Sequence, residues 1–508
     1  MKTCPALAAV AAWILAAGSA VLPAATNTLT TLAEDEVANG NCTLREALLA
    51  AIAQEPVDQC AGDIGPDVIV LGVPGAYELD DEDLSPLSGR DLTIRGDPSR
   101  PRSAYTIDLG GVQRLLDARA GSALRLENLE VASGYGHPTA DGRGGGALAL
   151  LNAGLTLRDV RISNCVAAVG GAIDIVSGTS LDLERVEFAA NQVGPLDAQL
   201  QHRGGALRVA WSSSAAVRLV DLRFVDNAIV DLTPNASGLG GALEVEASTA
   251  ADFELRDLAF EDNRLEVAGL AIGAGLFADL HATGARFVLA DSRFAGNDVV
   301  APATAARGTA FSVALGDAAG EIRRVRATGN GAGDAPAQVA FYAGGAMFAV
   351  LSDLLVDAGD GAGVFLLTEA GAWLDAGNLT VTGQAGDGVE LFASSGTLRL
   401  ENSIVWGNAA VAGAEIETFG TAPQVALENL VGVDPLFVDP GGGDYRLAAG
   451  SPAVDAGEAV FASVGPFDLA HGPRRLGGEI DLGALERGGI FADGFEVGDL
   501  VAWRARIP

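Results

Sequence analysis

The chain has 508 residues, of which 32 are Lys or Arg and 66 are Asp or Glu, so its formal net charge is −34. Hydrophobic residues make up 49% of the sequence, which is enough to bury a large core and excludes an intrinsically disordered chain. Because the chain is so acidic, nucleic acid and anionic membrane surfaces are poor partners, and we predict no nucleic-acid partner.

The first 25 residues have the composition of an export signal. Lys2 is followed by an apolar stretch from Ala6 to Ala17 and by the small-residue sequence Gly18-Ser19-Ala20, the pattern of a signal peptide and its cleavage site. The apolar run is short for a membrane-spanning helix, which disfavours the competing interpretation of a membrane anchor. We therefore predict a signal peptide over residues 1–25, an exported protein and no transmembrane segment.

Three cysteines remain after such a cleavage, and an oxidising compartment favours their pairing. Cys42 and Cys60 are close in sequence, so we expect a disulfide between them. Cys165 lies inside a repeat and is predicted to be a buried small hydrophobic side chain. This spacing does not indicate a metal site.

A repeated pattern of apolar residues dominates the rest of the chain. In its clearest copy Phe253, Leu255, Leu258 and Phe260 are apolar, and Asn263 closes the unit. Alternation places side chains on one face of a strand. The step of three between Leu255 and Leu258 therefore indicates a corner between two short strands that face the same interior. The pattern recurs about ten times.

A third short strand precedes many copies. It begins with Gly-Gly followed by Ala and alternating residues, and its copies start at Gly170, Gly204, Gly240 and Gly344. Glycine here indicates a turn that other residues enter only with strain. Three strands with two corners are one rung of a solenoid, so we predict an all-β fold, a right-handed parallel β-helix of about ten or more rungs. Glu244 and Glu246 are predicted to face solvent on one such strand.

The closing asparagines are predicted to form a structural ladder along the rod. An amide can donate to the rung on one side and accept from the other, and Asn tolerates the left-handed backbone of a sharp corner. Seven asparagines are expected to form this ladder: Asn164, Asn191, Asn227, Asn263, Asn297, Asn330 and Asn408.

The Gly-Gly-Ala element, paired with Phe-x-x-Asn as in Phe188–Asn191 and Phe260–Asn263, resembles the repeat of polymorphic outer membrane proteins. That family is a bacterial surface β-helix. The resemblance implies the same fold and a place at the cell surface.

The N-terminal segment is predicted to cover the open end of the first rung. Thr43 and Glu46 have the spacing of a capping box, and an apolar stripe predicts a short amphipathic helix over residues 43–54. The sequence Asn41-Cys42-Thr43-Leu44-Arg45-Glu46-Ala47 resembles the CSLREA domain, which implies an exported bacterial β-helix protein without an assigned reaction. We assign this cap and the first rungs to residues 26–122 and the repeats to residues 123–394.

Several sequence blocks near the C-terminus resemble, in order, the choice-of-anchor Q domain. They include Asp434-Pro435-Leu436-Phe437, Gly450-Ser451-Pro452-Ala453 and Asp481-Leu482-Gly483-Ala484. The resemblance covers residues 395–487 and implies a surface or secreted protein with a variable sorting signal at its very end. The tail over residues 488–508 is similar to short tails of exported Gram-negative proteins.

Two classes of function remain open. The resemblances favour a monomeric, non-enzymatic protein of the cell surface or extracellular space, in adhesion or another contact with an unknown protein or polysaccharide. The alternative is a carbohydrate-active enzyme, a polysaccharide lyase or glycoside hydrolase on a pectate-lyase-like β-helix. An enzyme predicts three or more charged side chains aligned on successive rungs in a groove. The sequence shows no catalytic motif of those families, so we assign no catalytic or cofactor-binding residue.

Two further features concern binding. Insertions at one repeat position are predicted to project as aligned loops from one side of the rod, and they span residues 192–203, 228–239, 264–272, 298–307 and 331–343.

A calcium site in the Gly/Pro-rich C-terminal segment is a lesser alternative, because carboxylates suit a hard cation, although Asp in loops of this kind more often caps turns. Its candidate ligands are Asp434, Asp439, Asp444 and Asp455. We therefore predict no cofactor and no metal.

Overall fold

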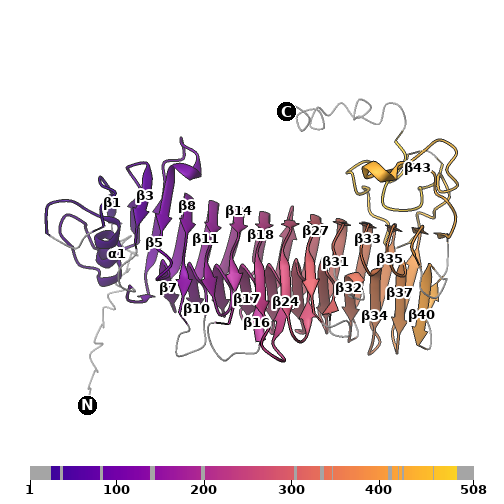
Figure 1. The fold of residues 1–508 in the computed structure, drawn as a ribbon, viewed down its shortest axis with the longest axis horizontal. Helices are drawn as coiled ribbons and strands as arrows, with labels where there is room; N and C mark the ends of the chain where they lie inside the picture. The colour runs from indigo at the N-terminus through magenta and orange to yellow at the C-terminus, as the bar shows by residue number, and fades with distance from the viewer. Residues whose placement is uncertain are drawn as a thin grey trace, which may run out of the picture.

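The protein is a rod built mainly of parallel strands (Figure 1). The computed structural model describes residues 25–34, 38–79, 84–137, 144–195, 201–301, 306–331, 337–345, 347–409, 415–420, 423–425, 428–461, 463–476 and 478–488. The predicted all-β parallel solenoid is confirmed. The predicted signal peptide, apart from its last residue, and the tail from residue 489 onwards lie outside the described residues.

One face of the rod is a twelve-stranded parallel sheet with one strand per rung. Its strands are β4 (Leu87–Ser88), β7 (Leu116–Arg119), β10 (Leu148–Leu151), β13 (Ile173–Val176), β17 (Leu207–Trp211), β21 (Leu243–Ala247), β26 (Leu276–Leu280), β30 (Phe311–Leu315), β32 (Ala337–Ala343), β34 (Ala362–Thr368), β37 (Val389–Ala393) and β40 (Ile416–Gly420). Glycines make the corner before several of these strands: Gly204 has a φ of +59°, and a Cβ on Gly205 would lie 1.7 Å from the carbonyl oxygen of Gly241.

A twenty-stranded sheet supplies the other strands of each rung, and many of them bend at the predicted corner. They are β1 (Thr26–Thr28), β2 (Asp67–Val70), β3 (Gly75–Glu78), β5 (Asp91–Arg95), β6 (Tyr105–Asp108), β8 (Ala123–Ala132), β11 (Gly154–Ser163), β14 (Ser180–Ala189), β18 (Val217–Val225), β22 (Asp252–Arg256), β23 (Ala259–Glu261), β27 (Arg286–Ala295), β31 (Ala319–Thr328), β33 (Phe348–Asp357), β35 (Trp373–Gly377), β36 (Thr380–Thr382), β38 (Thr397–Glu401), β39 (Ile404–Trp406), β41 (Pro423–Val425) and β42 (Leu430–Val431). We refer to it as the bent sheet.

The core lies between these two sheets and consists of the apolar residues of the repeat. Phe188, Phe224, Phe260 and Phe294 are all fully buried. Their rings stack in sequence, with centroids 5.0, 4.8 and 4.5 Å apart. Because each ring stacks on those of the neighbouring rungs, the core is a column that every rung extends by one layer.

The N-terminal end is covered by α1 (Leu44–Ala53), the predicted capping helix. Thr43 and Glu46 form the capping box: Thr43 Oγ1 accepts from the Glu46 amide at 3.2 Å, and Glu46 Oε2 accepts from the Thr43 amide at 3.0 Å. Leu44 and Leu48 belong to the same buried cluster as Ile69 of the first rung. The helix therefore closes the core rather than lying on its surface.

The predicted insertions are aligned in register, as expected, but they contain short strands and are not loops throughout. Backbone pairing in register between neighbouring insertions builds a six-stranded and a four-stranded parallel sheet. The first contains β9 (Tyr135–Gly136), β12 (Val166–Ala167), β15 (Gln192–Val193), β19 (Ala228–Asp231), β24 (Arg264–Val267) and β28 (Asp298–Val300). The second contains β16 (Gln201–Arg203), β20 (Ser237–Leu239), β25 (Ala271–Ile272) and β29 (Ala306–Arg307). They enclose a second apolar cluster, which includes Ile229 and Leu265, so we call this part the wing.

Two more predictions are wrong near these insertions. The fifth insertion, residues 331–343, includes β32, which is a strand of the twelve-stranded sheet, so Gly344 follows that strand instead of starting it. Glu244 does not face solvent: it is fully buried, because Arg203 of the wing crosses over it and donates to Oε1 at 2.8 Å. Its neighbour Glu246 keeps 45% of its side-chain surface exposed.

The C-terminal region, residues 432–488, stands above one edge of the rod near its end (Figure 1). Its only described sheet is the antiparallel pair β43 (Phe437–Asp439) and β44 (Asp444–Leu447), with the short helix η2 (Pro440–Gly442) between them. A second short helix, η1 (Arg102–Ala104), lies near the N-terminal end. Among the described residues, no helix is long and apolar enough to cross a membrane.

Candidate binding cleft

The corner of the bent sheet places one residue of ten successive rungs in a left-handed conformation. These corner residues are in register along the rod and have φ between 51° and 59°: Asn128, Asp159, Arg185, Asp221, Asp257, Asp291, Arg324, Asp353, Asn378 and Asn402. We call this set the corner row. Asn and Asp are the non-glycine residues that adopt this conformation most readily, which accounts for their frequency in the row.

The C-terminal region docks on the last part of the corner row. The amide of Asn402 exchanges two hydrogen bonds of 2.9 Å with the backbone of Glu458. Arg474, which is 2% exposed, pairs with Asp353 and donates to the carbonyl oxygen of Gly483 at 3.0 Å. A buried arginine with these acceptors fixes the region to the rod, because separation would leave its partner carboxylate unpaired.

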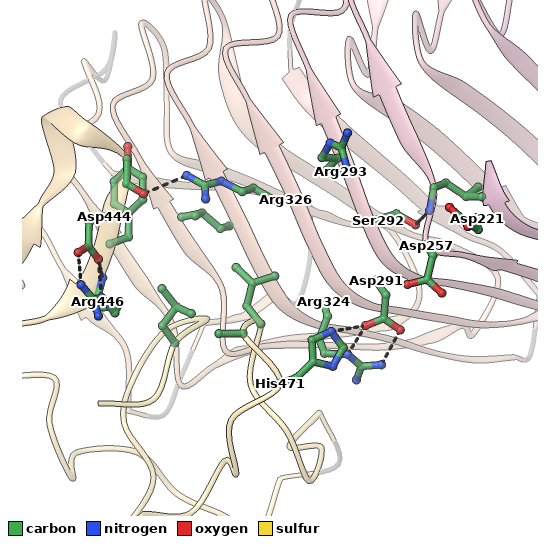
Figure 2. Close-up of a pocket in the computed structure, with 17 residues that line it drawn as sticks. Asp221, Asp257, Asp291, Ser292, Arg293, Arg324, Arg326, Asp444, Arg446 and His471 are labelled. Atoms are coloured by element: carbon green, nitrogen blue, oxygen red, sulfur yellow. Dashed lines mark hydrogen bonds and ion pairs between the residues drawn. The ribbon is translucent and has the colours of Figure 1, made fainter. Parts of the chain in front are cut away.

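A cleft of about 570 Å³ lies where the C-terminal region meets the uncovered part of the corner row (Figure 2). Its rod side comes from β18, the corner between β22 and β23, β27, β31 and β33, and its other side comes from β44 and the segment around His471. The polar residues that line it are Asp221, Asp257, Asp291, Ser292, Arg293, Arg324, Arg326, Asp444, Tyr445, Arg446 and His471.

Asp291 is the most heavily paired of these carboxylates. Arg324 binds it through two nitrogens, at 2.5 and 3.1 Å, and His471 Nε2 lies 3.3 Å from Oδ1. The hydrogen bond to Asp291 raises the pKa of Arg324 above its usual value. Asp291 therefore serves to hold the segment around His471 against the rod.

Asp221 and Asp257 differ from Asp291, because neither has an ion-pair partner within the described part of the chain. Burial raises the pKa of Asp257, and the charges of Asp291 and Asp221 raise it further, while His471 and Arg256 oppose the shift. The two residues are register neighbours, so their corners stand about one strand spacing, ~4.8 Å, apart. They can accept hydrogen bonds from a hydroxyl-bearing or cationic ligand.

The predicted disulfide is present: Cys42 and Cys60 are bonded, with their Cα atoms 5.0 Å apart, and Cys165 is free and buried. The disulfide ties the segment before α1 to the segment that follows it. Burial raises the pKa of the Cys165 thiol to about 12, so this side chain stays protonated.

Side-chain amides at the closing positions of the repeat form a ladder along a second corner of the rod. In each step the side-chain nitrogen donates to the side-chain oxygen of the next rung, at distances between 2.8 and 3.0 Å, for Asn191, Asn227, Asn263, Asn297 and Asn330. The same nitrogens also donate to backbone carbonyls of the rung before. At its far end Asn408 Oδ1 accepts from the backbone N–H of Gln384 at 3.1 Å, and Nδ2 donates to Glu415.

The prediction for Asn164 is wrong. Asn164 is exposed and has a φ of 55°, and it stands one residue before the ladder position. Cys165 occupies that position, and its backbone amide donates to Oδ1 of Asn191 at 3.1 Å. Sequence reasoning also missed Gln338, which accepts from Asn330 and donates to Gln384 inside the ladder.

The four candidate calcium ligands do not come together. Asp434 and Asp439 each accept a hydrogen bond from a backbone amide two or three residues later, which is a turn-capping role. Asp444 pairs with Arg446, and Asp455 accepts from the amide of Gly478. In the described ranges no group of three His, Cys, Asp or Glu residues is placed to hold a metal ion.

The wing also contains a buried polar pair that the sequence did not predict. His202 and Asp231 are 0% and 3% exposed, and Nε2 of the histidine lies 2.6 Å from Oδ2 of the aspartate. Asp231 Oδ1 also accepts from the backbone amide of Thr233 at 2.7 Å. These contacts connect neighbouring insertions and indicate a structural role.

Comparison with known proteins adds no family to these observations. No protein-family model matches the chain, and no curated protein matches it.

Proposed function

We propose that the protein is an exported, non-enzymatic solenoid of the bacterial surface or extracellular space that contacts an extracellular ligand through the cleft. The observation that carries the proposal is a pair of carboxylates, Asp221 and Asp257, that have no ion-pair partner among the described residues and lie in a cleft that also presents Arg293 and Arg326. Such a surface suits a hydroxyl-rich ligand, because hydroxyl groups both donate to carboxylates and accept from guanidinium groups.

The backbone of the corner row favours binding over catalysis. Asp353, Asn378 and Asn402, which lie under the C-terminal region outside the cleft lining, have the same left-handed backbone as Asp221 and Asp257. The carboxylates are therefore accounted for by the geometry of the corner without a catalytic requirement. Asp291 is further committed to Arg324 and His471.

A carbohydrate-active enzyme is the second candidate, and one specific observation favours it. Asp221, Asp257 and Asp291 lie on successive rungs in a cleft, which is the arrangement that the enzyme alternative predicts. The raised pKa of Asp257 beside other carboxylates also suits an acid–base pair.

The two candidates are separated by incubating the protein with a panel of neutral and acidic polysaccharides. Bound glycan, unsaturated products and new reducing ends are measured for the native protein, Asp257→Asn and Asp226→Asn. Asp226 is a matched control, because it is exposed, has a φ of 53° and lies outside the cleft lining.

We expect the native protein to bind a glycan and to form no product. Asp257→Asn should lower the affinity for that glycan about tenfold, and Asp226→Asn should leave the affinity unchanged. Products that disappear in Asp257→Asn alone would establish the enzyme instead. If no member of the panel is bound or converted, the cleft is not a glycan site and the proposal is wrong.

A further inference from the structure

The outer face of the twelve-stranded sheet becomes aromatic over its last rungs. One outward column runs in register through Tyr342, Leu367, Phe392 and Phe419, on β32, β34, β37 and β40. Phe419 is 42% exposed, and the other three are half-buried. Phe365 joins the column from the side, with its ring centroid 5.7 Å from that of Tyr342. We call these five residues the aromatic column.

Two carboxylates lie beside this column in an unfavourable arrangement. Glu390 and Glu417 are register partners on β37 and β40, so two like charges are directly opposed. Neither carboxylate has an ion-pair partner among the described residues. Burial raises the pKa of Glu390 to about 7, and the nearby charges of Asp387 and Glu417 add to the shift. The arrangement costs stability.

The same sheet avoids this cost on earlier rungs. At the equivalent outward positions Asp174, Arg208 and Glu244 alternate in charge along β13, β17 and β21. Arg208 lies 3.3 Å from a carboxylate oxygen of Asp174 and 3.4 Å from one of Glu244. An unrelieved like-charge pair beside partly exposed aromatic rings departs from the arrangement of these earlier rungs, and such departures are expected at functional sites.

The chemistry of the surface identifies the ligand. An ammonium group pairs with carboxylates and is attracted to the faces of aromatic rings. The chain itself gives an example in this column, because the guanidinium carbon of Arg307 lies 5.7 Å from the ring centroid of Tyr342 and Nη1 donates to Oη at 3.0 Å. The apolar face of a sugar ring packs on aromatic side chains, and successive rungs repeat the same surface along the rod.

We propose that the aromatic column, together with Glu390 and Glu417, binds a linear polymer of amino sugars along the rod axis. The net charge of −34 favours a cationic polymer and repels an acidic one. This site lies on the twelve-stranded sheet, whereas the cleft lies between the bent sheet and the C-terminal region. Either proposal can therefore be wrong without affecting the other.

The test is calorimetric titration with a glucosamine hexamer and with its N-acetylated form at about pH 7, where the free amines keep much of their charge and Glu390, whose pKa is about 7, is partly ionised. The acetylated hexamer keeps the sugar faces and lacks the charge, so it is the matched control ligand. We expect binding of the glucosamine hexamer only. Glu417→Gln should weaken it about tenfold and Phe392→Ala about fivefold. Asp252→Asn, which removes an exposed charge on the bent sheet, should change it less than about twofold.

Equal binding of the acetylated hexamer would overturn the proposal, because the ammonium groups would then have no role. If Asp252→Asn lost as much affinity for the hexamer as Glu417→Gln, the binding would depend on the overall charge of the protein and not on this site. If an oligolysine binds more tightly than the glucosamine hexamer with the same dependence on Glu417 and Phe392, the ligand is a basic peptide and the proposal is wrong. Glu417→Gln removes a repulsion, so its thermal midpoint should not fall below that of the native protein.

Discussion

A Cβ atom on Gly359 would lie 2.3 Å from the side-chain nitrogen of Gln338, because this glutamine fills the ladder position that the glycine leaves open. Gln338 reaches the position from β32. Its oxygen accepts from Asn330 at 3.0 Å, and its nitrogen donates to Gln384 at 2.8 Å. The ladder therefore continues across a rung that supplies no amide of its own.

This relationship predicts a rescue. Gln338→Ala should lower the free energy of unfolding by about 2 kcal/mol, because it leaves the amides of Asn330 and Gln384 buried without their partner. Gly359→Asn alone should destabilise the protein through the close contact with Gln338, whereas in the Gln338→Ala background it should restore part of the loss. Urea denaturation of the four proteins measures the coupling. Additive effects would show that Gln338 does not replace the missing amide.

The aromatic stack predicts the largest effect of a single core substitution. Phe260→Asp should cost about 3 kcal/mol or more, because it removes a fully buried ring and introduces a buried charge. Hydrogen exchange should rise first in the rungs of Phe224 and Phe294, whose rings lie 4.8 and 4.5 Å away. The exposed Glu246→Ala serves as the control and should change stability by about 0.5 kcal/mol or less. A tolerated Phe260→Asp would place this side chain outside the core.

Glu244 predicts a pH dependence of stability. Burial raises its pKa to about 7 from an ordinary value of 4.5, although the charges of Arg208 and Arg203 oppose the shift. A raised carboxyl pKa contributes stability that is full below pH 4.5 and is lost as the pH rises through about 7, because the buried group must then ionise. Glu244→Gln cannot ionise, so relative to the native protein it should gain up to about 3 kcal/mol between these limits. Denaturation midpoints that differ equally at both pH values would contradict the assignment.

Arg474 predicts selective release of the C-terminal region. Arg474→Ala leaves the carboxylates of Asp353 and Glu486 buried without their cation, which should weaken docking by about 3–5 kcal/mol. Hydrogen exchange should increase in residues 463–488 and stay unchanged in the phenylalanine stack. Arg475→Ala is the matched control, since Arg475 is exposed and pairs with Glu479 at 3.2 Å. Exchange that rises throughout the rod would mean that Arg474 stabilises the whole fold.

The elements that sequence periodicity defines were predictable, and those that depend on distant contacts were not. Leu255 and Leu258 were enough to predict the corner, because the slip in their alternation has one structural explanation. The environment of Glu244 could not be predicted, since alternation places it outward, whereas Arg203 of a separate insertion packs over it. The prediction for Asn164 was wrong because the left-handed residue and the ladder residue are one position apart in the sequence.

The cleft had no signal in the sequence. Asp257 and Asp291 are spaced by one rung, but His471, which pairs with Asp291, comes from a region with little regular structure. Its docking depends on Arg474, whose contact with Asp353 spans 121 residues. Gln338 was hidden for a related reason, because a strand of the twelve-stranded sheet supplies an amide to a ladder otherwise built at another corner.

Each rung pairs residue for residue with the next, so every rung adds the same step to the length of the rod. Asn191, Asn227 and Asn263 are separated by 36 residues each and hold the same hydrogen bonds. Removing residues 228–263 would join two surfaces that already match, and the disulfide-bonded cap and the C-terminal region would move closer by one strand spacing, about 4.8 Å. Evolution can therefore change the reach of this protein in whole steps, by duplication or loss of a unit, without redesigning either end.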